Sequence, residues 1–389
     1  KKFWVKGGIL IFVGAIGAVV RIISPFLTNK ENDPGVIVVD SSLKNIVPIL
    51  GGHKAGADQI ALEIAHDFGS NAVLTGFSVN HQKLSVDSFG DLWGWKRSGD
   101  LLSWNDLMFQ QTKDLPISFE QSSGSFLWQS CESAANSLSA FQNLLGIESP
   151  QLFIGSKLLG KCNWHPATLW VGIGCERDTS FNLIQRAFNQ SFEKAGLAKE
   201  AIAGFATIQI KKDERYLIEF FNRENLPIRF YYSEQLSEVS TPNPSDLVQK
   251  EVGTASVAES ASILAAGNGS NLLFEKQIYK AHKDEKGAVT IAISESSEPF
   301  APSRGELHLV GSGPGDLSFL SHDARHALSR TAVWFGYKRY LDLLDPLRRN
   351  DQVRVDGSLS NERSRCKEAL NLAMQGVRVA LISSGDSGV

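Results

Sequence analysis

Short apolar runs alternate with glycine-rich or polar turns along most of the chain. Many of the runs are rich in Val and Ile, which favour strands. Between them lie longer segments with apolar residues at helical spacing, among them Ile60, Ile64 and Phe68, which we predict to form one buried stripe. This alternation predicts an α/β fold, with several small α/β domains in tandem. We predict strands at residues 35–40, 46–50, 169–174, 202–210, 227–231, 272–274, 289–293, 307–310, 331–335 and 377–382, and helices at residues 59–69, 181–195, 257–266 and 360–375.

The apolar run at residues 7–20 has two interpretations, because lysines precede it as they precede a signal peptide or membrane anchor. The run is shorter than the roughly 20 residues that span a bilayer, and its glycines interrupt a helix. We therefore predict a buried strand, turn and helix here, and no membrane partner.

Residues 76–166 are harder to interpret, although they contain five of the eight tryptophans. The indole rings either stack on a flat macrocycle or pack in a small β-rich core, which is the commoner use of tryptophan. Residues 110–125 are polar and are predicted to form a mobile loop.

Composition narrows the classes of function. The chain has 389 residues, a net charge of −3 and no dense basic stripe, so nucleic acid is not an expected partner. Four scattered cysteines without a Cys-x-x-Cys pair argue against a disulfide framework and a protein-bound metal, and they fit a reducing, cytoplasmic compartment.

Two turns carry candidate chemistry in the first 300 residues. His53 follows Gly51 and Gly52 between a strand and a helix, where backbone N–H groups favour anionic ligands; a histidine that caps its own loop is the alternative. Cys175 lies in a second glycine turn and is either a nucleophile or a small buried thiol, and Asp178 or Thr179 is predicted to cap the next helix.

Segments 18–25, 30–40 and 51–61 resemble the cobalamin-biosynthesis protein G family, the cobalt-precorrin-5A hydrolases. The Val-Gly-Ile-Gly-Cys-x-Arg-x-Thr turn that starts at residue 171 and the phrase at 252–259 resemble its C-terminal domain. Gly51 stands where serine is frequent in that family, and the phrase before Arg21 also departs from its pattern.

The resemblance implies hydrolytic opening of a lactone on a corrin ring, with release of acetaldehyde. Such chemistry needs a base to activate water and N–H donors to stabilise an oxyanion. On this hypothesis His53 is the base, Gly51 and Gly52 support the oxyanion, and Arg21 pairs with a carboxylate of the tetrapyrrole substrate.

The last segment begins with an apolar strand that runs into Gly311-Ser-Gly-Pro-Gly-Asp316. This turn, the Gly336-Tyr-x-x-Tyr-Leu-Asp342 segment, the pair Glu362–Arg363 and a Ser-Gly-Asp loop resemble the tetrapyrrole methylases, most closely precorrin-3B C17-methyltransferase; Ser387 stands where many relatives carry proline. The resemblance implies S-adenosyl-L-methionine as cofactor and, in the full-length protein, C17 methylation of precorrin-3B at the ring-contraction step. The expected cofactor-binding residues are Gly311, Gly313, Pro314, Gly315, Asp316, Gly385 and Asp386.

The expected organisation is a fused bifunctional protein, truncated at both ends. We assign residues 1–75 to a hydrolase N-terminal domain, 76–166 to a middle region, 167–294 to a C-terminal hydrolase domain, 295–304 to a linker and 305–389 to the first, incomplete lobe of a methylase. A non-catalytic module that binds corrinoids or acts as a scaffold is the alternative function. The sequence leaves a homodimer open.

Overall fold

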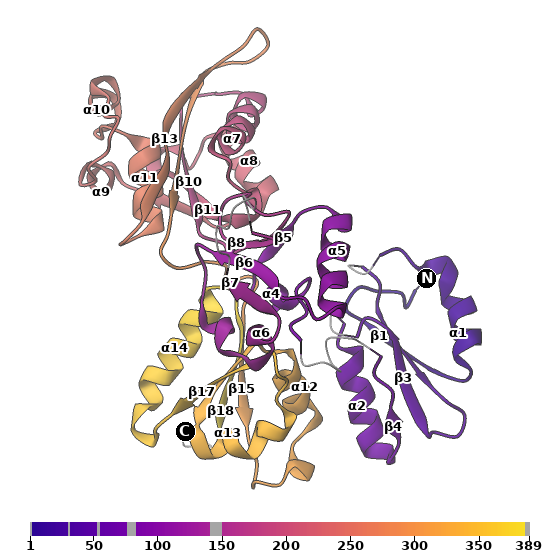
Figure 1. Ribbon diagram of the computed structural model, residues 1–389. Coiled ribbons are helices and arrows are strands. Elements are labelled where there is room, and N and C mark those ends of the chain that lie inside the picture. Colours follow the sequence, from indigo (N-terminus) through magenta and orange to yellow (C-terminus); the bar gives the residue numbers. More distant parts are fainter. Residues whose placement is uncertain (1, 30–31, 53–54, 76–82, 141–149, 386–389) are drawn as a thin grey trace.

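The computed structural model describes residues 2–29, 32–52, 55–75, 83–140 and 150–385 (Figure 1). Its strands form four sheets, each made of strands from one part of the chain. Helices cover the sheets, so the fold is mixed α/β as predicted. The part around β6 and β8 lies at the centre of the molecule, and the other three sheets are arranged around it (Figure 1).

The first sheet has the order β1-β2-β3-β4 and lies between two helices. Val19 and Ile23 of α1 pack with Val36 and Val38, whereas α2 packs on the opposite face. Residues 7–20 thus form a strand, turn and helix as predicted, but the prediction that they are buried is wrong in part, since Ile11 is 52% and Val13 70% exposed. Within the described parts of the chain no helix is long and apolar enough to cross a membrane. The elements are β1 (Ile9–Val13), α1 (Ile16–Ile23), η1 (Ser24–Phe26), β2 (Gly35–Val39), β3 (Asn45–Leu50), α2 (Ala57–Phe68) and β4 (Asn71–Ala72).

The predicted buried stripe of α2 is wrong in one respect. Phe68 is 65% exposed, and the residues that α2 buries are Ala57, Ala61 and Ala65. Because alanine has a short side chain, these three positions let the helix lie close to the sheet, and the larger Ile60 and Ile64 flank the contact.

The central sheet has the order β5-β9-β8-β6-β7. Its tryptophans at 93, 95, 104, 128 and 164 are all buried, which confirms the interpretation that they form a core. The predicted mobile loop at 110–125 is wrong: β6 lies inside it and pairs with both β7 and β8. Ile117 and Phe119 pack in the core and alternate with the polar Ser118 and Glu120, as in a half-buried strand. The elements are α4 (Phe89–Leu92), β5 (Lys96–Ser98), α5 (Leu101–Thr112), β6 (Ile117–Gln121), η2 (Leu127–Ser130), α6 (Glu132–Ala135), β7 (Leu138–Ala140), β8 (Leu152–Ile154) and β9 (Cys162–His165).

The third sheet has the order β12-β11-β10-β14-β13. Helices α7 and α8 pack on one face and α11 on the other. The predicted helices at 181–195 and 257–266 are confirmed. The predicted cap of the first helix is wrong: Ser180, and not Asp178 or Thr179, occupies the N-cap position, and the Thr179 hydroxyl donates to the Glu176 carbonyl instead. The elements are β10 (Leu169–Cys175), α7 (Phe181–Ala195), η3 (Lys199–Ala201), β11 (Ile202–Ile208), η4 (Gln209–Lys211), α8 (Arg215–Glu224), β12 (Ile228–Tyr231), α9 (Ser233–Ser237), α10 (Asp246–Val252), α11 (Val257–Ala266), β13 (Asn271–Lys280) and β14 (Ala288–Glu295).

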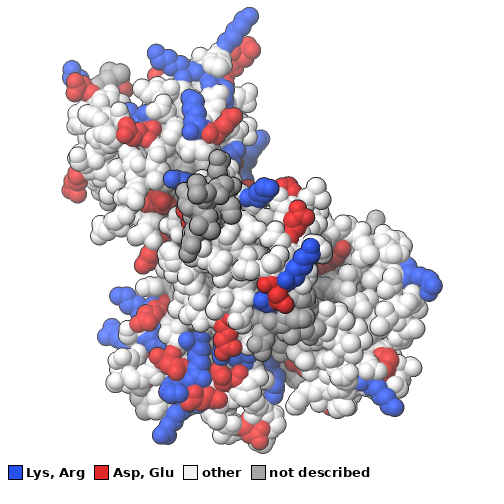
Figure 2. Space-filling view, in the orientation of Figure 1, with Lys and Arg blue, Asp and Glu red and all other residues white. Residues whose placement is uncertain are grey.

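The fourth sheet is parallel throughout, with the order β15-β18-β16-β17. The sequence predicted three of these strands and the last helix, but not β17, α12 or α13. Figure 2 shows acidic and basic side chains closely mixed over this segment. The elements are β15 (Glu306–Gly311), η5 (Leu317–Phe319), α12 (His322–Arg330), β16 (Val333–Tyr337), α13 (Lys338–Leu344), η6 (Asp345–Leu347), β17 (Val353–Gly357), η7 (Leu359–Asn361), α14 (Glu362–Met374) and β18 (Arg378–Ser383).

One hydrophobic cluster joins the central and fourth sheets. It contains the buried tryptophans of residues 84–164 together with Val333, Phe335 and Val379. Residues 296–305 have no regular structure, yet they pack as well: Ala301 is buried and its N–H donates to the Met374 carbonyl at 2.9 Å. The central part and the last segment therefore fold against each other through a common core.

Candidate functional site

The turn after β3 brings Gly51 and Gly52 to the start of α2. Gly51 has a φ of +68°, and a Cβ there would lie 2.8 Å from the Cα of Gly35, so the turn requires glycine. The Gly51 carbonyl accepts from the Ala55 N–H at 3.0 Å, and the Gly52 carbonyl accepts from the Asp58 N–H at 3.2 Å. His53 lies outside the described residues.

An acidic side chain already lies beside this turn. The carboxylate oxygens of Asp58, in the first turn of α2, are 2.5 and 2.6 Å from the position that a Cβ on Gly52 would take. The positive end of the helix dipole therefore faces a carboxylate of the protein itself. A second anion at the same place would meet repulsion from Asp58, which weakens the case for Gly52 as an oxyanion donor.

Arg21 lies on a different face of the sheet. It belongs to α1, whose cluster includes Val36 and Val38, whereas α2 packs on the side of Ile37 and Val39. Its guanidinium donates to the Gly17 carbonyl of its own helix at 3.2 Å. Among the described residues, no hydrogen bond or ion pair joins Arg21 to the turn after β3.

A cavity of about 410 Å³, which no sequence motif indicated, lies at the opposite edge of the first sheet. Asp40, which follows β2, lies at this edge, and hydrogen bonds from the Asn45 side chain and the Lys44 N–H lower the pKa of its carboxyl to about 2. The carboxylate thus holds the turn between β2 and β3. The cavity is lined by Gly14, Ala15, Ile16, Val38, Asp40, Asn45, Val47 and Val73.

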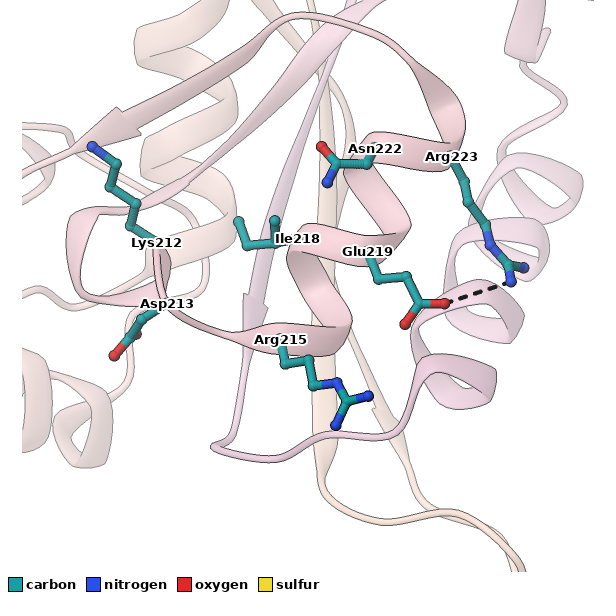
Figure 3. Close-up of a pocket in the computed structure, with 7 residues that line it drawn as sticks. All are labelled: Lys212, Asp213, Arg215, Ile218, Glu219, Asn222 and Arg223. Atoms are coloured by element: carbon teal, nitrogen blue, oxygen red, sulfur yellow. Dashed lines mark ion pairs between the residues drawn. The ribbon is translucent and has the colours of Figure 1, made fainter.

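A second cavity, of about 540 Å³, lies along the exposed side of α8 (Figure 3). Its charges are mostly compensated, since Arg223 pairs with Glu219 at 3.5 Å and Asp213 pairs with Arg177 at 2.7 Å. The lining side chains come from one helix and the turn before it: Lys212, Asp213, Arg215, Ile218, Glu219, Asn222 and Arg223. The lining holds three basic and two acidic side chains and no histidine, cysteine or serine, so it offers no candidate nucleophile or imidazole base for the reaction.

Cys175 does not have the properties of a nucleophile. Burial raises the pKa of its thiol to about 11, with a smaller opposite effect from Lys211, so the thiol is protonated near neutral pH. Burial likewise raises the pKa of Cys162 to about 12. In the described parts of the chain, no group of three or more His, Cys, Asp or Glu side chains could hold a metal ion.

We predict that iodoacetamide at neutral pH modifies the exposed Cys366 first. Cys175 should react at least about 100-fold more slowly, because a raised pKa leaves little thiolate. Peptide mass spectrometry over time measures both rates, and all four cysteines should react after unfolding in urea. Early modification of Cys175 would contradict the assignment of this residue as a structural thiol.

The glycine-rich turn after β15 and the loop after β18 meet at one edge of the fourth sheet. β15 and β18 are adjacent and parallel, and a Cβ on Gly311 would lie 3.0 Å from the Cα of Gly385. The Asp316 carboxylate accepts from the N–H and hydroxyl of Ser318, both at 2.8 Å, and these bonds lower its pKa. Asp316 therefore shapes the turn. Asp386 lies outside the described residues.

The same turn leaves space where a ligand could approach its backbone. Gly313 and Gly315 have φ values of +66° and +112°. Among the described residues, a Cβ on Gly313 would find only the Phe319 carbonyl at 4.0 Å, and one on Gly315 only the Leu343 side chain at 3.8 Å. In parallel α/β sheets, ligands bind at this carboxyl edge of the strands. The assignment of Gly311, Gly313, Pro314, Gly315 and Gly385 to a cofactor site stays a prediction, and the space at Gly313 and Gly315 is compatible with it.

Two family models match the chain: one described as Cobalamin synthesis G N-terminal matches residues 1–78, and one described as Cobalamin synthesis G C-terminus matches residues 169–294. A cobalt-precorrin-5A hydrolase from Priestia megaterium is 28% identical over 301 residues, which cover 73% of this chain and 78% of that protein.

Two methyltransferases match a shorter part. A cobalt-factor III methyltransferase from Priestia megaterium is 38% identical over 86 residues, which cover 22% of this chain and 16% of that protein. A precorrin-3B C(17)-methyltransferase from Sinorhizobium sp is 38% identical over 85 residues, which cover 22% of this chain and 33% of that protein. The chain thus spans a third or less of these two relatives.

Proposed function

This chain belongs to the cobalamin synthesis G family and is fused to part of a C17-methyltransferase, and from this we propose that it opens the lactone of cobalt-precorrin-5A and releases acetaldehyde. The observation that carries the proposal is the match to a hydrolase relative over 73% of the chain, together with family models on both sides of the central part. The substrate is a tetrapyrrole, and any cobalt arrives within it.

In the proposed reaction, His53 removes a proton from water, which attacks the lactone carbonyl. His53 follows Gly51 and Gly52 in the sequence, and Gly51 cannot be replaced without moving Gly35. The backbone of Gly51 and Gly52 is proposed to support the oxyanion. The Asp58 carboxylate beside Gly52 points to a further requirement: the substrate must bring its carbonyl to the turn and keep its carboxylates away.

Arg21 is proposed to bind a carboxylate of the ring. Because α1 and α2 cover opposite faces of the first sheet, a macrocycle that reached both Arg21 and the glycine turn would have to extend around an edge of that sheet. This placement makes Arg21 a peripheral contact, and its loss should weaken binding more than turnover.

For the last segment we propose a share in C17 methylation by the full-length protein. Bound S-adenosyl-L-methionine supplies the methyl group. Gly313 and Gly315 would let the cofactor approach the backbone, and the contact between Gly311 and Gly385 would fix the two loops against each other. The relatives act on precorrin-3B or cobalt-factor III, and we propose precorrin-3B. We also propose a cytoplasmic site of action, which the four free cysteines support.

Incubation of the chain with cobalt-precorrin-5A, followed by an enzymatic assay of acetaldehyde, tests the hydrolase proposal. We expect one molecule of acetaldehyde for each molecule of cobalt-precorrin-5A consumed, over many turnovers of the protein. Tight binding of the corrinoid without acetaldehyde would instead favour a non-catalytic binding or scaffold module. A spectroscopic titration of the corrinoid in the same samples separates these two outcomes.

A further inference from the structure

A serine and a histidine that lie 67 positions apart in the sequence meet in the central sheet. The Ser98 hydroxyl, at the end of β5, is 2.7 Å from Nε2 of His165, at the end of β9. The other ring nitrogen, Nδ1, is 2.7 Å from the backbone carbonyl of Gly155. The two strands pair antiparallel, which places both side chains on one face of the sheet.

These contacts fix the direction of each hydrogen bond. A carbonyl can only accept, so Nδ1 of His165 carries a proton and donates it to Gly155. Burial lowers the pKa of His165, which is fully buried, so the ring is neutral near pH 7. Nε2 of a neutral ring with a protonated Nδ1 can only accept. The Ser98 hydroxyl therefore donates to His165, as a nucleophile donates to its general base.

The surrounding chain holds Ser98 in place and leaves it partly exposed. Trp104 donates from its indole N–H to the Ser98 carbonyl at 3.1 Å, which fixes the backbone at this residue. β5 is an edge strand of its sheet. Gly99 follows with a φ of +112°, and Asp100 then caps α5, so the hydroxyl lies at a sharp strand-to-helix turn. Ser98 is thus partly exposed at the edge of the sheet, whereas His165 is buried.

Two cations lie near this pair. Lys96 directly opposes His165 in the strand register and shares a face of β5 with Ser98. Burial lowers the pKa of Lys96, and the neighbouring Arg304 lowers it further. Arg304 donates to the Gly94 carbonyl at 3.0 Å, and within the described residues neither cation forms an ion pair with a carboxylate. The carboxylates of Glu200 and Glu224 raise the pKa of Lys96 in turn, so acidic side chains of the chain itself partly offset this cation.

We infer that Ser98 and His165 form a second nucleophilic centre, whose substrate class is a small ester. Ser98 Oγ attacks the carbonyl carbon while its proton passes to Nε2 of His165. The C–O bond of the ester breaks, and the leaving oxygen takes that proton. Water then attacks the acyl carbon and gives a proton to His165; the acyl C–Oγ bond breaks, and His165 returns this proton to Ser98 Oγ as the acid leaves. None of these steps depends on the proposed lactone opening at His53.

Diisopropyl fluorophosphate tests the centre without any corrinoid. Attack by Ser98 on phosphorus expels fluoride and leaves a stable adduct. We expect one adduct per intact chain, located at Ser98 by peptide mass spectrometry and absent in Ser98→Ala. Ser130→Ala is the matched control, because the Ser130 hydroxyl donates to the Leu127 carbonyl with no imidazole beside it. Ser130→Ala should label like the parent chain.

His165→Asn tests the role of His165 as a base separately from its structural role. The asparagine amide can still donate to the Gly155 carbonyl, but it has no group that accepts a proton at the position of Nε2. We expect labelling at Ser98 to slow by about 100-fold or more, with an unchanged circular dichroism spectrum and unfolding midpoint. The inference is overturned if the parent chain gives no adduct at Ser98, or if His165→Asn labels at the parent rate. Ser98→Ala tests it independently should His165→Asn fail to fold.

Discussion

Replacing His53 with alanine is expected to slow acetaldehyde release from cobalt-precorrin-5A by about 10²- to 10⁴-fold. The physical reason is that water is a poor nucleophile near neutral pH until a base removes its proton. Corrinoid binding should change little, because the imidazole is proposed to act on water and not on the ring. Rates under saturating substrate, together with a spectroscopic binding titration, measure the two quantities separately.

His66→Ala is the matched control for this substitution. His66 lies on α2, shortly after the same glycine turn, and its side chain is 72% exposed. Its loss removes an imidazole from the same part of the chain without touching the turn, so release should continue at the parent rate. If His53→Ala also releases acetaldehyde at that rate, then His53 is not the base, and its role is to cap the loop.

We also expect a substitution of Asp58 to change the rate of acetaldehyde release, because its carboxylate lies beside Gly52. Asp58→Asn removes a negative charge beside Gly52 but keeps nearly the same shape. If the oxyanion develops at this turn, the substitution should raise the rate by a few-fold to about 10-fold, since a charge near an anion costs on the order of 1 kcal/mol. A slower rate would instead show that the Asp58 carboxylate itself supports the reaction.

Local signals in the sequence predicted much of the fold. The helices at 181–195 and 257–266 begin and end as predicted, because apolar spacing and a glycine just after each end are properties of the segment itself. β17 was missed because Val353-Arg-Val-Asp-Gly357 is short and half polar, as suits a strand at the sheet edge. Such a strand is recognised by its partner β16 and not by its own composition.

The sequence indicated candidate site residues only where they lie together in one turn or loop. The glycine turn after β15 and the Ser-Gly-Asp loop are local motifs, and the parallel sheet brings them together. Arg21 was expected near Gly51, but which face of a sheet a helix covers depends on packing across the domain. The contact between Ser98 and His165 had no local signal, because it depends on the register of two strands far apart in the sequence.

The common core of the central and last segments leads to the second large effect. Gly94 lies between two buried tryptophans, has a φ of +72°, and faces Gly376 of the last segment. A Cβ on Gly94 would lie 2.3 Å from the Gly376 carbonyl oxygen. Gly94→Ala should therefore cost about 1–2 kcal/mol for the left-handed backbone and a further ~1–3 kcal/mol for the displaced carbonyl.

Gly196→Ala separates these two costs. Gly196 ends α7 with a φ of +62°, and a Cβ there would find no described residue within 4 Å, so Gly196→Ala should lose only the backbone part, about 1–2 kcal/mol. Urea unfolding of both variants gives the difference. An equal loss in both would mean that Gly94 and Gly376 do not pack against each other. A larger loss for Gly94→Ala, with earlier proteolysis near residue 305, would mean that the central part and the last segment stabilise each other. The fusion would then be a structural requirement of this chain, because either segment alone would expose the tryptophan core that they share.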